Sequence, residues 1–158
     1  MSFLAIPALV SHLRTIPSNS PDREMAESHT LSIFRQTYEN GKNRMPPVAL
    51  GSTVLGLVHA YQLYGTTDSF NQKSQLAVVA GVLNIAILPW TLLAMAPTNN
   101  SIFAREEAWK EGDDERKVEV AKKQGGRSTE SVLNRWVLLN FCRACFPLAG
   151  AVLAWYAY

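Results

Sequence analysis

Charged residues are scarce in this sequence. Asp, Glu, Lys and Arg make up 18% of its 158 residues, against about 25% in a typical soluble domain. The formal net charge of +2 is too small for a strongly basic nucleic-acid binder, so we expect no nucleic-acid partner. Cysteine is also rare, and two residues cannot build a disulfide-rich secreted scaffold. An apolar content of 47% excludes a long disordered chain, and the length predicts a single domain over residues 1–158.

Several motifs that carry chemistry are missing. The sequence has no glycine-rich loop that cradles phosphate and no Gly-x-Ser-x-Gly nucleophile motif. His12, His29 and His59 lie on different segments without the spacing of metal ligands, so we expect no metal site. Cys142 and Cys145 have the spacing of a redox pair. On a helix, however, both would point away from the polar stripe described below, so we expect small apolar residues there.

Long apolar runs dominate the chain. Pro47 to Tyr64, Leu76 to Ala96 and Val132 to Tyr158 reach or nearly reach the roughly 20 residues that a helix needs to cross a bilayer. Met1 to Val10 is too short. We expect this run to be the exit end of a first membrane span. That span is either shortened at its N-terminus or enters the bilayer only halfway. The predicted fold class is all-α: a membrane four-helix bundle with an incomplete first span and two partly helical polar loops.

The distribution of basic residues predicts the orientation. They concentrate in the polar loops 11–46 and 97–131, whereas the short connection 65–75 holds only Lys73. The positive-inside rule then places both loops on the cytoplasmic side of an integral membrane protein. An endomembrane is the expected location.

Local signals predict helices within both loops. Ser20-Pro21 is typical of a helix start and Asn40-Gly41 of a helix end. Met45-Pro46-Pro47 is expected to bend the chain into the next span. Ser101 is a candidate cap for a second helix, which Gln124-Gly125-Gly126 would break before Ser128 starts the last span.

Polar side chains recur within the apolar runs. They are Trp136, Asn140 and Arg143 on the last run, Asn84 and Thr91 on the run before it, and Ser52 and His59 on the run before that. Spacings of three, four and seven residues place each set on one helix face. Because polar groups at membrane depth usually face the bundle interior, we predict a small polar pocket between apolar walls.

Each of these residues also has a purely structural interpretation. Arg143 could extend to the membrane surface, although an arginine at the centre of a span costs about 2.5–3.5 kcal/mol on insertion scales. His59 could bond a neighbouring helix, and Asn84 and Thr91 could be packing contacts.

Two motifs resemble those of a known family. One is Leu88 to Ile102, with the sequence LPWTLLAMAPTNNSI, and the other is Trp136-x3-Asn140-x2-Arg143 followed by Pro147-Leu148. The segments Ser2 to Leu9, Tyr38-x2-Gly41 and Pro46-Pro47 extend the likeness along the chain. Together they are similar to the anthrone oxygenase family, small four-helix membrane proteins of aromatic polyketide pathways in fungi and bacteria. The family usually has a complete first span before the Ile-Pro segment.

The resemblance implies a monooxygenase reaction. An anthrone polyketide would be oxidised by O2 at its benzylic methylene to an anthraquinone, with no flavin, haem or obligatory metal. In this interpretation His59 is the base and Arg143 stabilises the anionic substrate. The expected substrate-binding residues are Tyr38, Asn84, Thr91, Asn99, Asn100, Trp136 and Asn140.

Alternatives remain at this point. The same pocket could serve another oxidation or a cyclisation of a phenolic intermediate. A non-catalytic membrane adaptor that binds a hydrophobic polyketide intermediate is a further hypothesis. A shortened first helix would expose an apolar groove that a second copy could fill, so a homo-oligomer is also considered.

Overall fold

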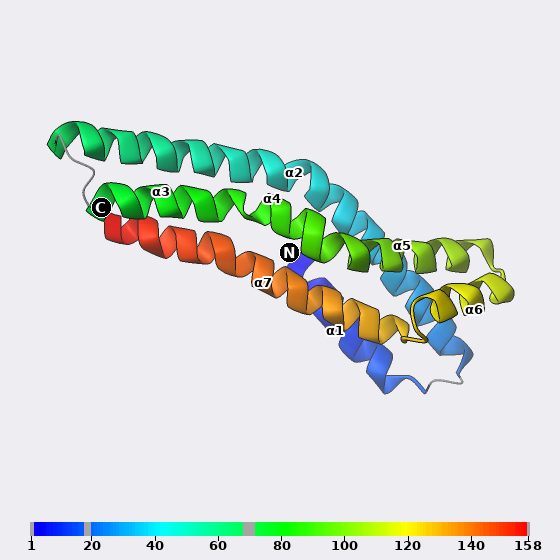
Figure 1. Cartoon of the computed structure of the whole chain (residues 1–158). Helices are drawn as coiled ribbons and strands as arrows, with labels where there is room; N and C mark the ends of the chain where they lie inside the picture. The colour runs from blue at the N-terminus through cyan, green and yellow to red at the C-terminus, as the bar shows by residue number, and fades with distance from the viewer. Residues whose placement is uncertain (1, 18–19, 68–71, 158) are drawn as a thin grey trace. The chain divides into compact units, whose positions relative to one another are not determined.

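The computed structural model describes residues 2–17, 20–67 and 72–157 (Figure 1). Within these residues every regular element is a helix, which confirms the all-α prediction. The elements are α1 (Ser2–Thr15), α2 (Pro21–Thr67), α3 (Gln72–Ile85), α4 (Ile87–Trp90), the π-helix η1 (Thr91–Met95), α5 (Ala96–Glu111), α6 (Asp114–Lys123) and α7 (Thr129–Ala157).

The start of α2 follows the predicted signal, but its end does not. The Ser20 hydroxyl accepts a hydrogen bond from the backbone N–H of Asp22 at 3.2 Å, as a helix cap does. The predicted end at Asn40-Gly41 is wrong, because one helix runs through it and on through Pro46-Pro47. The bend at Met45-Pro46-Pro47 stays a prediction. Glycine and proline cost about 1 and 3 kcal/mol inside a helix. Where the helix has already formed on both sides of such a residue, only the local hydrogen bonds are lost and the helix continues through it.

Ser101 does not cap a helix. It lies inside α5, and its hydroxyl donates to the carbonyl of Pro97 at 2.9 Å. The helix ends at Gly112, whose φ of 69° is in the left-handed region. Asp113 then caps α6 by accepting from two backbone N–H groups.

The predicted break before the last helix is confirmed. Gly125 and Gly126 both have positive φ, at 71° and 68°, which other residues rarely adopt. The Ser128 hydroxyl then accepts from the backbone N–H of Ser131 at 3.2 Å and caps α7.

Among the described residues, two helical stretches are long and apolar enough to cross a membrane by length and composition. One is Gln72–Glu111, which includes α3, α4, η1 and α5, and the other is Thr129–Ala157. Pro89 explains the interruption after α3, because it has no N–H to offer the carbonyl of Ile85. The run Pro47 to Tyr64 is helical within α2 but is not one of these two stretches.

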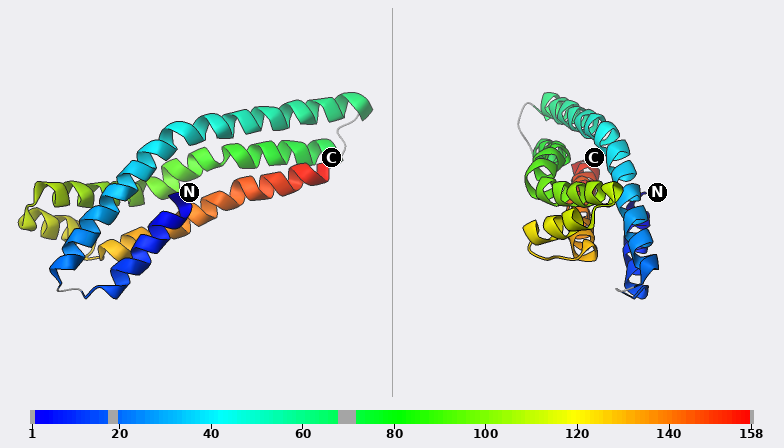
Figure 2. Two further views of the ribbon diagram at one scale, coloured as in Figure 1. Left: turned by 180° about the vertical axis from the view of Figure 1, so that it is seen from behind. Right: turned by 90° about the vertical axis from the view of Figure 1, so that its right-hand side faces the viewer.

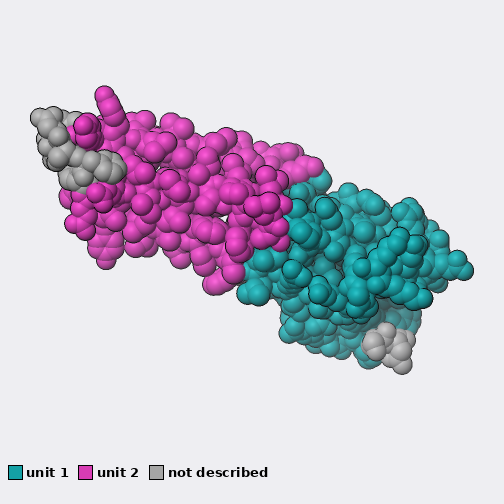
Figure 3. All heavy atoms as spheres, in the orientation of Figure 1, with its two compact units in different colours: residues 1–41, 95–139 teal, residues 42–94, 140–158 magenta. Residues whose placement is uncertain are grey.

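The chain divides into two compact units (Figure 3). The first unit comprises Met1–Gly41 and Met95–Leu139, and the second comprises Lys42–Ala94 and Asn140–Tyr158. The expected single domain over 1–158 stays a prediction, and each unit is described by itself.

The first unit has a core of large side chains. Ile6 and Leu13 of α1, Phe34 of α2, Ile102 of α5 and Leu133 of α7 are fully buried. Such side chains each contribute about 1.5–3 kcal/mol through burial. Conventional hydrophobic packing therefore holds this unit together.

The second unit packs through small residues. A Cβ atom built on Gly56 of α2 would lie 3.3 Å from the Cα of Gly81 on α3. One built on Gly150 of α7 would lie 3.0 Å from the carbonyl oxygen of Ala80. The Thr53 hydroxyl donates to the Gly81 carbonyl at 3.2 Å. Close backbone approach at small residues is the usual way that membrane helices associate, and Figure 2 shows these helix segments of the second unit side by side.

Candidate functional site

The predicted site residues fall into both units. Tyr38, Asn99, Asn100 and Trp136 belong to the first unit, whereas His59, Asn84, Thr91, Asn140 and Arg143 belong to the second.

In the first unit, aromatic side chains from three helices meet. Phe34 packs edge-on against Trp136, with ring centroids 5.1 Å apart, and lies 5.8 Å from Phe103. Tyr38 packs edge-on against Phe103 at 4.8 Å. We call Phe34, Tyr38, Phe103 and Trp136 the aromatic cluster. Edge-to-face pairs of this kind contribute about 0.5–1.5 kcal/mol beyond burial, so the cluster fixes the orientation of Trp136.

Two buried polar atoms lie at the aromatic cluster without a partner. Trp136 is 6% exposed and Asn99 is 3% exposed. Among the described residues, neither the indole Nε1 of Trp136 nor the Oδ1 of Asn99 has a hydrogen-bond partner. Asn99 lies one turn before Phe103 on the same face of α5. An unpaired buried polar group costs about 1–3 kcal/mol, so both are candidates for contacts with a ligand. Asn100, in contrast, is exposed.

An ionic cluster supports the aromatic cluster from the polar side. Glu106, which is 2% exposed, accepts a hydrogen bond from Arg35 at 2.6 Å and forms an ion pair with Lys110 at 2.6 Å. The Arg35 guanidinium also stacks over Phe103, 4.8 Å from the ring centroid. The two interactions link α2 and α5 within this unit and hold Phe103 in place.

In the second unit, Asn84 faces α7. A Cβ atom on Gly150 would lie 3.5 Å from the Asn84 Nδ2, so the amide packs directly on the glycine. Gly150 is seven residues beyond Arg143, on the predicted polar stripe of α7. Phe146 of α7 also meets Trp90, with ring centroids 5.6 Å apart. Asn84 of α3 therefore faces the predicted polar stripe of α7 at Gly150.

Asn140 and Arg143 continue that stripe. Asn140 is 4% exposed, and no described residue hydrogen-bonds its Oδ1. The Arg143 side chain is half-buried. An amide oxygen that is buried and unpaired can accept from a phenolic hydroxyl, and a guanidinium can stabilise an anionic oxygen.

His59 and Thr91 have different settings in the second unit. His59 is half-buried on α2, three residues beyond Gly56, the residue that meets α3. The Thr91 hydroxyl donates to the carbonyl of Ile87 at 2.7 Å, which leaves its oxygen lone pairs to accept. Thr91 is also the first residue of η1, and π-helical turns occur frequently at functional sites.

The two cysteines are free thiols, half-buried at Cys142 and exposed at Cys145. Within the described part of the chain, no three His, Cys, Asp or Glu side chains gather as they would around a metal ion. The expectations of no redox role and no metal stay predictions.

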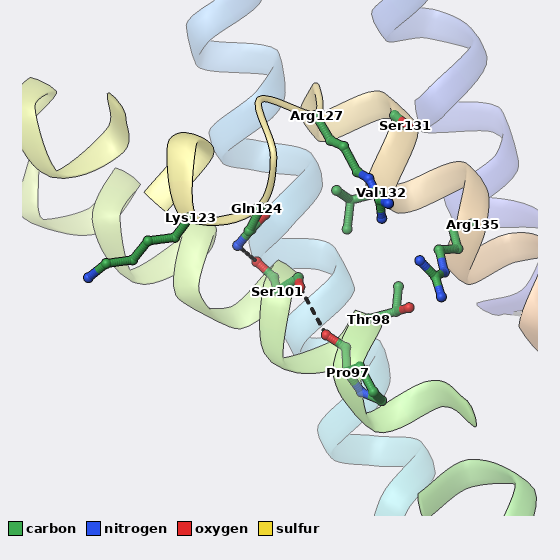
Figure 4. Close-up of a pocket in the computed structure, with 9 residues that line it drawn as sticks. All are labelled: Pro97, Thr98, Ser101, Lys123, Gln124, Arg127, Ser131, Val132 and Arg135. Carbon is green, nitrogen blue, oxygen red and sulfur yellow. Dashed lines mark hydrogen bonds between the residues drawn. The ribbon is translucent and has the colours of Figure 1, made fainter. Parts of the chain in front are cut away.

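A basic pocket in the first unit was not predicted (Figure 4). It has a volume of about 450 Å³ and is lined by side chains of α5, α6, the following loop and α7. Its lining includes Thr98, Lys123, Gln124, Arg127 and Arg135, and none of its lining residues was a predicted site residue. The two arginines that flank the start of the last apolar run were the sequence signal from which this basic pocket could have been predicted.

Comparisons with known proteins agree with the motifs. Residues 34–153 match the family model described as anthrone oxygenase. The chain is 26% identical to the anthrone oxygenase AgnL2 of Paecilomyces divaricatus, over 97% of this chain and 80% of that protein. It is 29% identical to a noranthrone monooxygenase of Aspergillus flavus, over 96% of this chain and 66% of that protein.

A third relative, the anthrone oxygenase ptaC of Pestalotiopsis fici, is 31% identical over 77% of this chain and 79% of that protein. No solved structure matches the chain. The family match covers well over half of the sequence. The chain therefore belongs to the anthrone oxygenase family and is an oxygenase enzyme.

Proposed function

We propose that this protein oxidises an anthrone-type polyketide to an anthraquinone with O2 in secondary-metabolite biosynthesis, without a cofactor. The observation that carries the proposal is the family match over residues 34–153, together with relatives named as anthrone oxygenases. The buried polar groups of the two units support it, because they suit a flat, phenolic, largely apolar substrate.

The proposed reaction balances without an external reductant. A base removes one proton from the methylene of the anthrone, which leaves an aromatic, electron-rich anthranolate. The anthranolate transfers an electron to O2, and the resulting radical and superoxide combine into a peroxide. Loss of water from the peroxide gives the ketone, so one oxygen atom enters the quinone and the other leaves as water. The substrate itself supplies the electrons.

The second unit carries the proposed acid–base and electrostatic groups. His59 is proposed as the base, since a positioned general base contributes typically about 10²–10⁴-fold. Arg143 is proposed to stabilise the anthranolate oxygen, because a cation acts most strongly where water is excluded. Asn140, with its buried unpaired oxygen, is proposed to accept from a substrate hydroxyl. Asn84 and Thr91 are proposed as further substrate contacts.

The first unit carries the proposed aromatic contacts. Trp136 presents both a ring and an unpaired N–H, which suits an aromatic substrate with oxygen substituents. Asn99 and Tyr38 are proposed to contact the substrate from the same unit, and Asn100 is proposed as a more exposed contact.

We also propose that the protein is an integral membrane protein of an endomembrane. The two candidate spans support this location. A four-helix arrangement would add α1 and the apolar part of α2 to them. Segments 11–46 and 97–131 would then lie on the cytoplasmic side.

The direct test is oxidation of emodin anthrone by the purified protein in detergent micelles. We expect quinone to form faster than in the protein-free background, with a metal chelator present, and ¹⁸O2 to label one quinone oxygen. Loss of turnover under argon would agree with O2 as co-substrate. No acceleration, combined with saturable binding of the anthrone, would reject the enzyme and favour a binder of polyketide intermediates.

The role of His59 has its own test. We expect His59→Ala to lower kcat by about 10²–10⁴-fold, with the helix content unchanged. His29→Ala is the matched control, since His29 is exposed on the same helix in the other unit. Full turnover in His59→Ala would remove this residue as the base and leave the oxidation itself standing.

A further inference from the structure

We propose that the basic pocket of the first unit binds the phosphate group of an anionic phospholipid. The inference rests on the proposed membrane insertion but is independent of the proposed reaction.

Two cations in the pocket are uncompensated. Among the described residues, neither Arg127 nor Arg135 forms an ion pair with a carboxylate, and the pocket lining contains no Asp or Glu. Lys123 differs, because its ammonium pairs with Glu119 at 2.7 Å and points away from the two guanidinium groups in Figure 4. The hydrogen bond from Lys123 lowers the pKa of Glu119. The net positive charge of the pocket therefore comes from the two arginines.

The walls offer fixed hydrogen-bonding groups. Thr98 is 4% exposed, and Figure 4 shows its hydroxyl on the side of Arg135. Gln124 is held in place by two bonds, from Arg105 at 2.6 Å and to the Ser101 carbonyl at 2.9 Å. A hydroxyl donor and two guanidinium forks match the oxygen atoms of a phosphate group. Because Thr98 and Gln124 are already ordered, their contacts with a ligand cost little further conformational entropy.

The position of the pocket favours a lipid as the source of the phosphate. Pro97 and Thr98 follow directly after the charge-free run that ends at Ala96, and Val132 and Arg135 begin the last apolar run. The pocket therefore lies where the apolar run 76–96 ends and the run 132–158 begins. Phospholipid headgroups lie at this depth, and basic pockets between spanning helices are suited to anionic headgroups.

The test measures binding to the full chain in detergent micelles, by the shift in thermal unfolding with three probes. These are dioctanoyl phosphatidic acid, dioctanoyl phosphatidylcholine and inorganic phosphate. We expect saturable stabilisation by the phosphatidic acid, at least tenfold weaker binding of the phosphatidylcholine, and competition by millimolar phosphate. If inorganic phosphate binds as tightly as the phosphatidic acid, the pocket is a site for a soluble anion and the proposal is wrong.

Variants locate the site. Arg127→Gln combined with Arg135→Gln should weaken binding of the phosphatidic acid about 30-fold, which corresponds to roughly 1 kcal/mol for each arginine. The control is Arg116→Gln combined with Lys122→Gln, which removes the same charge from exposed residues of the same unit outside the pocket. The control should bind within about twofold of the parent protein. Equal loss in both double variants, or no loss in the first, would overturn the proposal.

A charge-conserving variant separates binding from folding. Arg127→Lys combined with Arg135→Lys keeps both positive charges, so it should retain most of the affinity while losing the bidentate geometry of guanidinium. We expect a loss of about threefold, against about 30-fold for the glutamine variant. A lysine variant that loses as much as the glutamine variant would show that the effect is structural and would reject the phosphate site.

Discussion

The two units of this protein are stabilised by different kinds of interaction. The first unit contains all the ion pairs described above, among them the half-buried contact between Arg35 and Glu106 at 2.6 Å. The second unit relies on glycine contacts such as Gly56 with Gly81. The second unit also exposes most of the large apolar side chains. Among the described residues, every exposed large apolar side chain except Met25, Val118 and Leu138 belongs to this unit.

This difference is the one expected of a protein whose second unit lies in lipid and whose first unit lies in water. Exposed apolar side chains are stable when the surroundings are lipid, whereas a surface rich in ion pairs is stable in water. In lipid, apolar side chains give helices no reason to associate, so close backbone contact at glycine takes over that role. The following substitutions test the comparison, from the largest expected effect to the smallest.

Arg105→Met should have the largest effect on stability. Arg105 is 7% exposed and donates to Gln124, to the Thr129 hydroxyl at 3.0 Å and to the carbonyl of Arg127. Its loss leaves three buried or half-buried acceptors unpaired. Each unpaired buried acceptor costs about 1–3 kcal/mol, so we expect a loss of about 3–5 kcal/mol in the free energy of unfolding. Thermal unfolding in detergent, followed by circular dichroism, measures it.

The control for this substitution is Arg116→Met. Arg116 forms an exposed ion pair with Glu111, and such pairs contribute less than about 1 kcal/mol. Equal effects of the two substitutions would show that burial of the Arg105 network does not stabilise the first unit.

Gly150→Val tests the small-residue packing of the second unit. A side chain at this position meets the backbone of Ala80, which cannot rotate away, so we expect a loss of about 1–3 kcal/mol. Gly51→Val is the matched control, because no described atom outside the glycine's own stretch of helix lies within 4 Å of a Cβ built there. If both variants unfold at the same temperature, close approach between α3 and α7 is not what holds this unit.

Asn140→Leu and Asn99→Leu compare one unpaired amide from each unit. Replacing a buried, unpaired amide by an apolar side chain of similar volume should raise the free energy of unfolding by about 1 kcal/mol. The same change should raise the KM for the anthrone, because the lost oxygen would otherwise accept from the substrate. A variant with unchanged KM and lower stability would identify that asparagine as a packing residue.

Sequence signals were reliable where the cause of the structure is local. Helix starts at Ser20 and Ser128 and the break at Gly125-Gly126 follow from side-chain caps and backbone conformations within a few residues. The predicted helix end at Asn40-Gly41 failed for a physical reason. A glycine weakens a helix by only about 1 kcal/mol, which the flanking turns of a long helix can offset.

Candidate site residues were predictable only as separate helix faces. The spacing of Asn140 and Arg143 placed both on one stripe of α7, and the contact between Gly150 and Asn84 shows that the stripe faces α3. The aromatic cluster was not predicted, because Phe34 and Phe103 look like ordinary core residues until the fold brings them to Trp136.

The sequence by itself determined the helical class, the family and the helix faces on which polar residues lie, because these depend on composition, motif and periodicity along one segment. Tertiary structure alone decided which faces meet, which buried amides stay unpaired and where Arg127 and Arg135 enclose a pocket. Those features depend on contacts between residues far apart in the chain, and helical periodicity carries no information about the neighbouring helix.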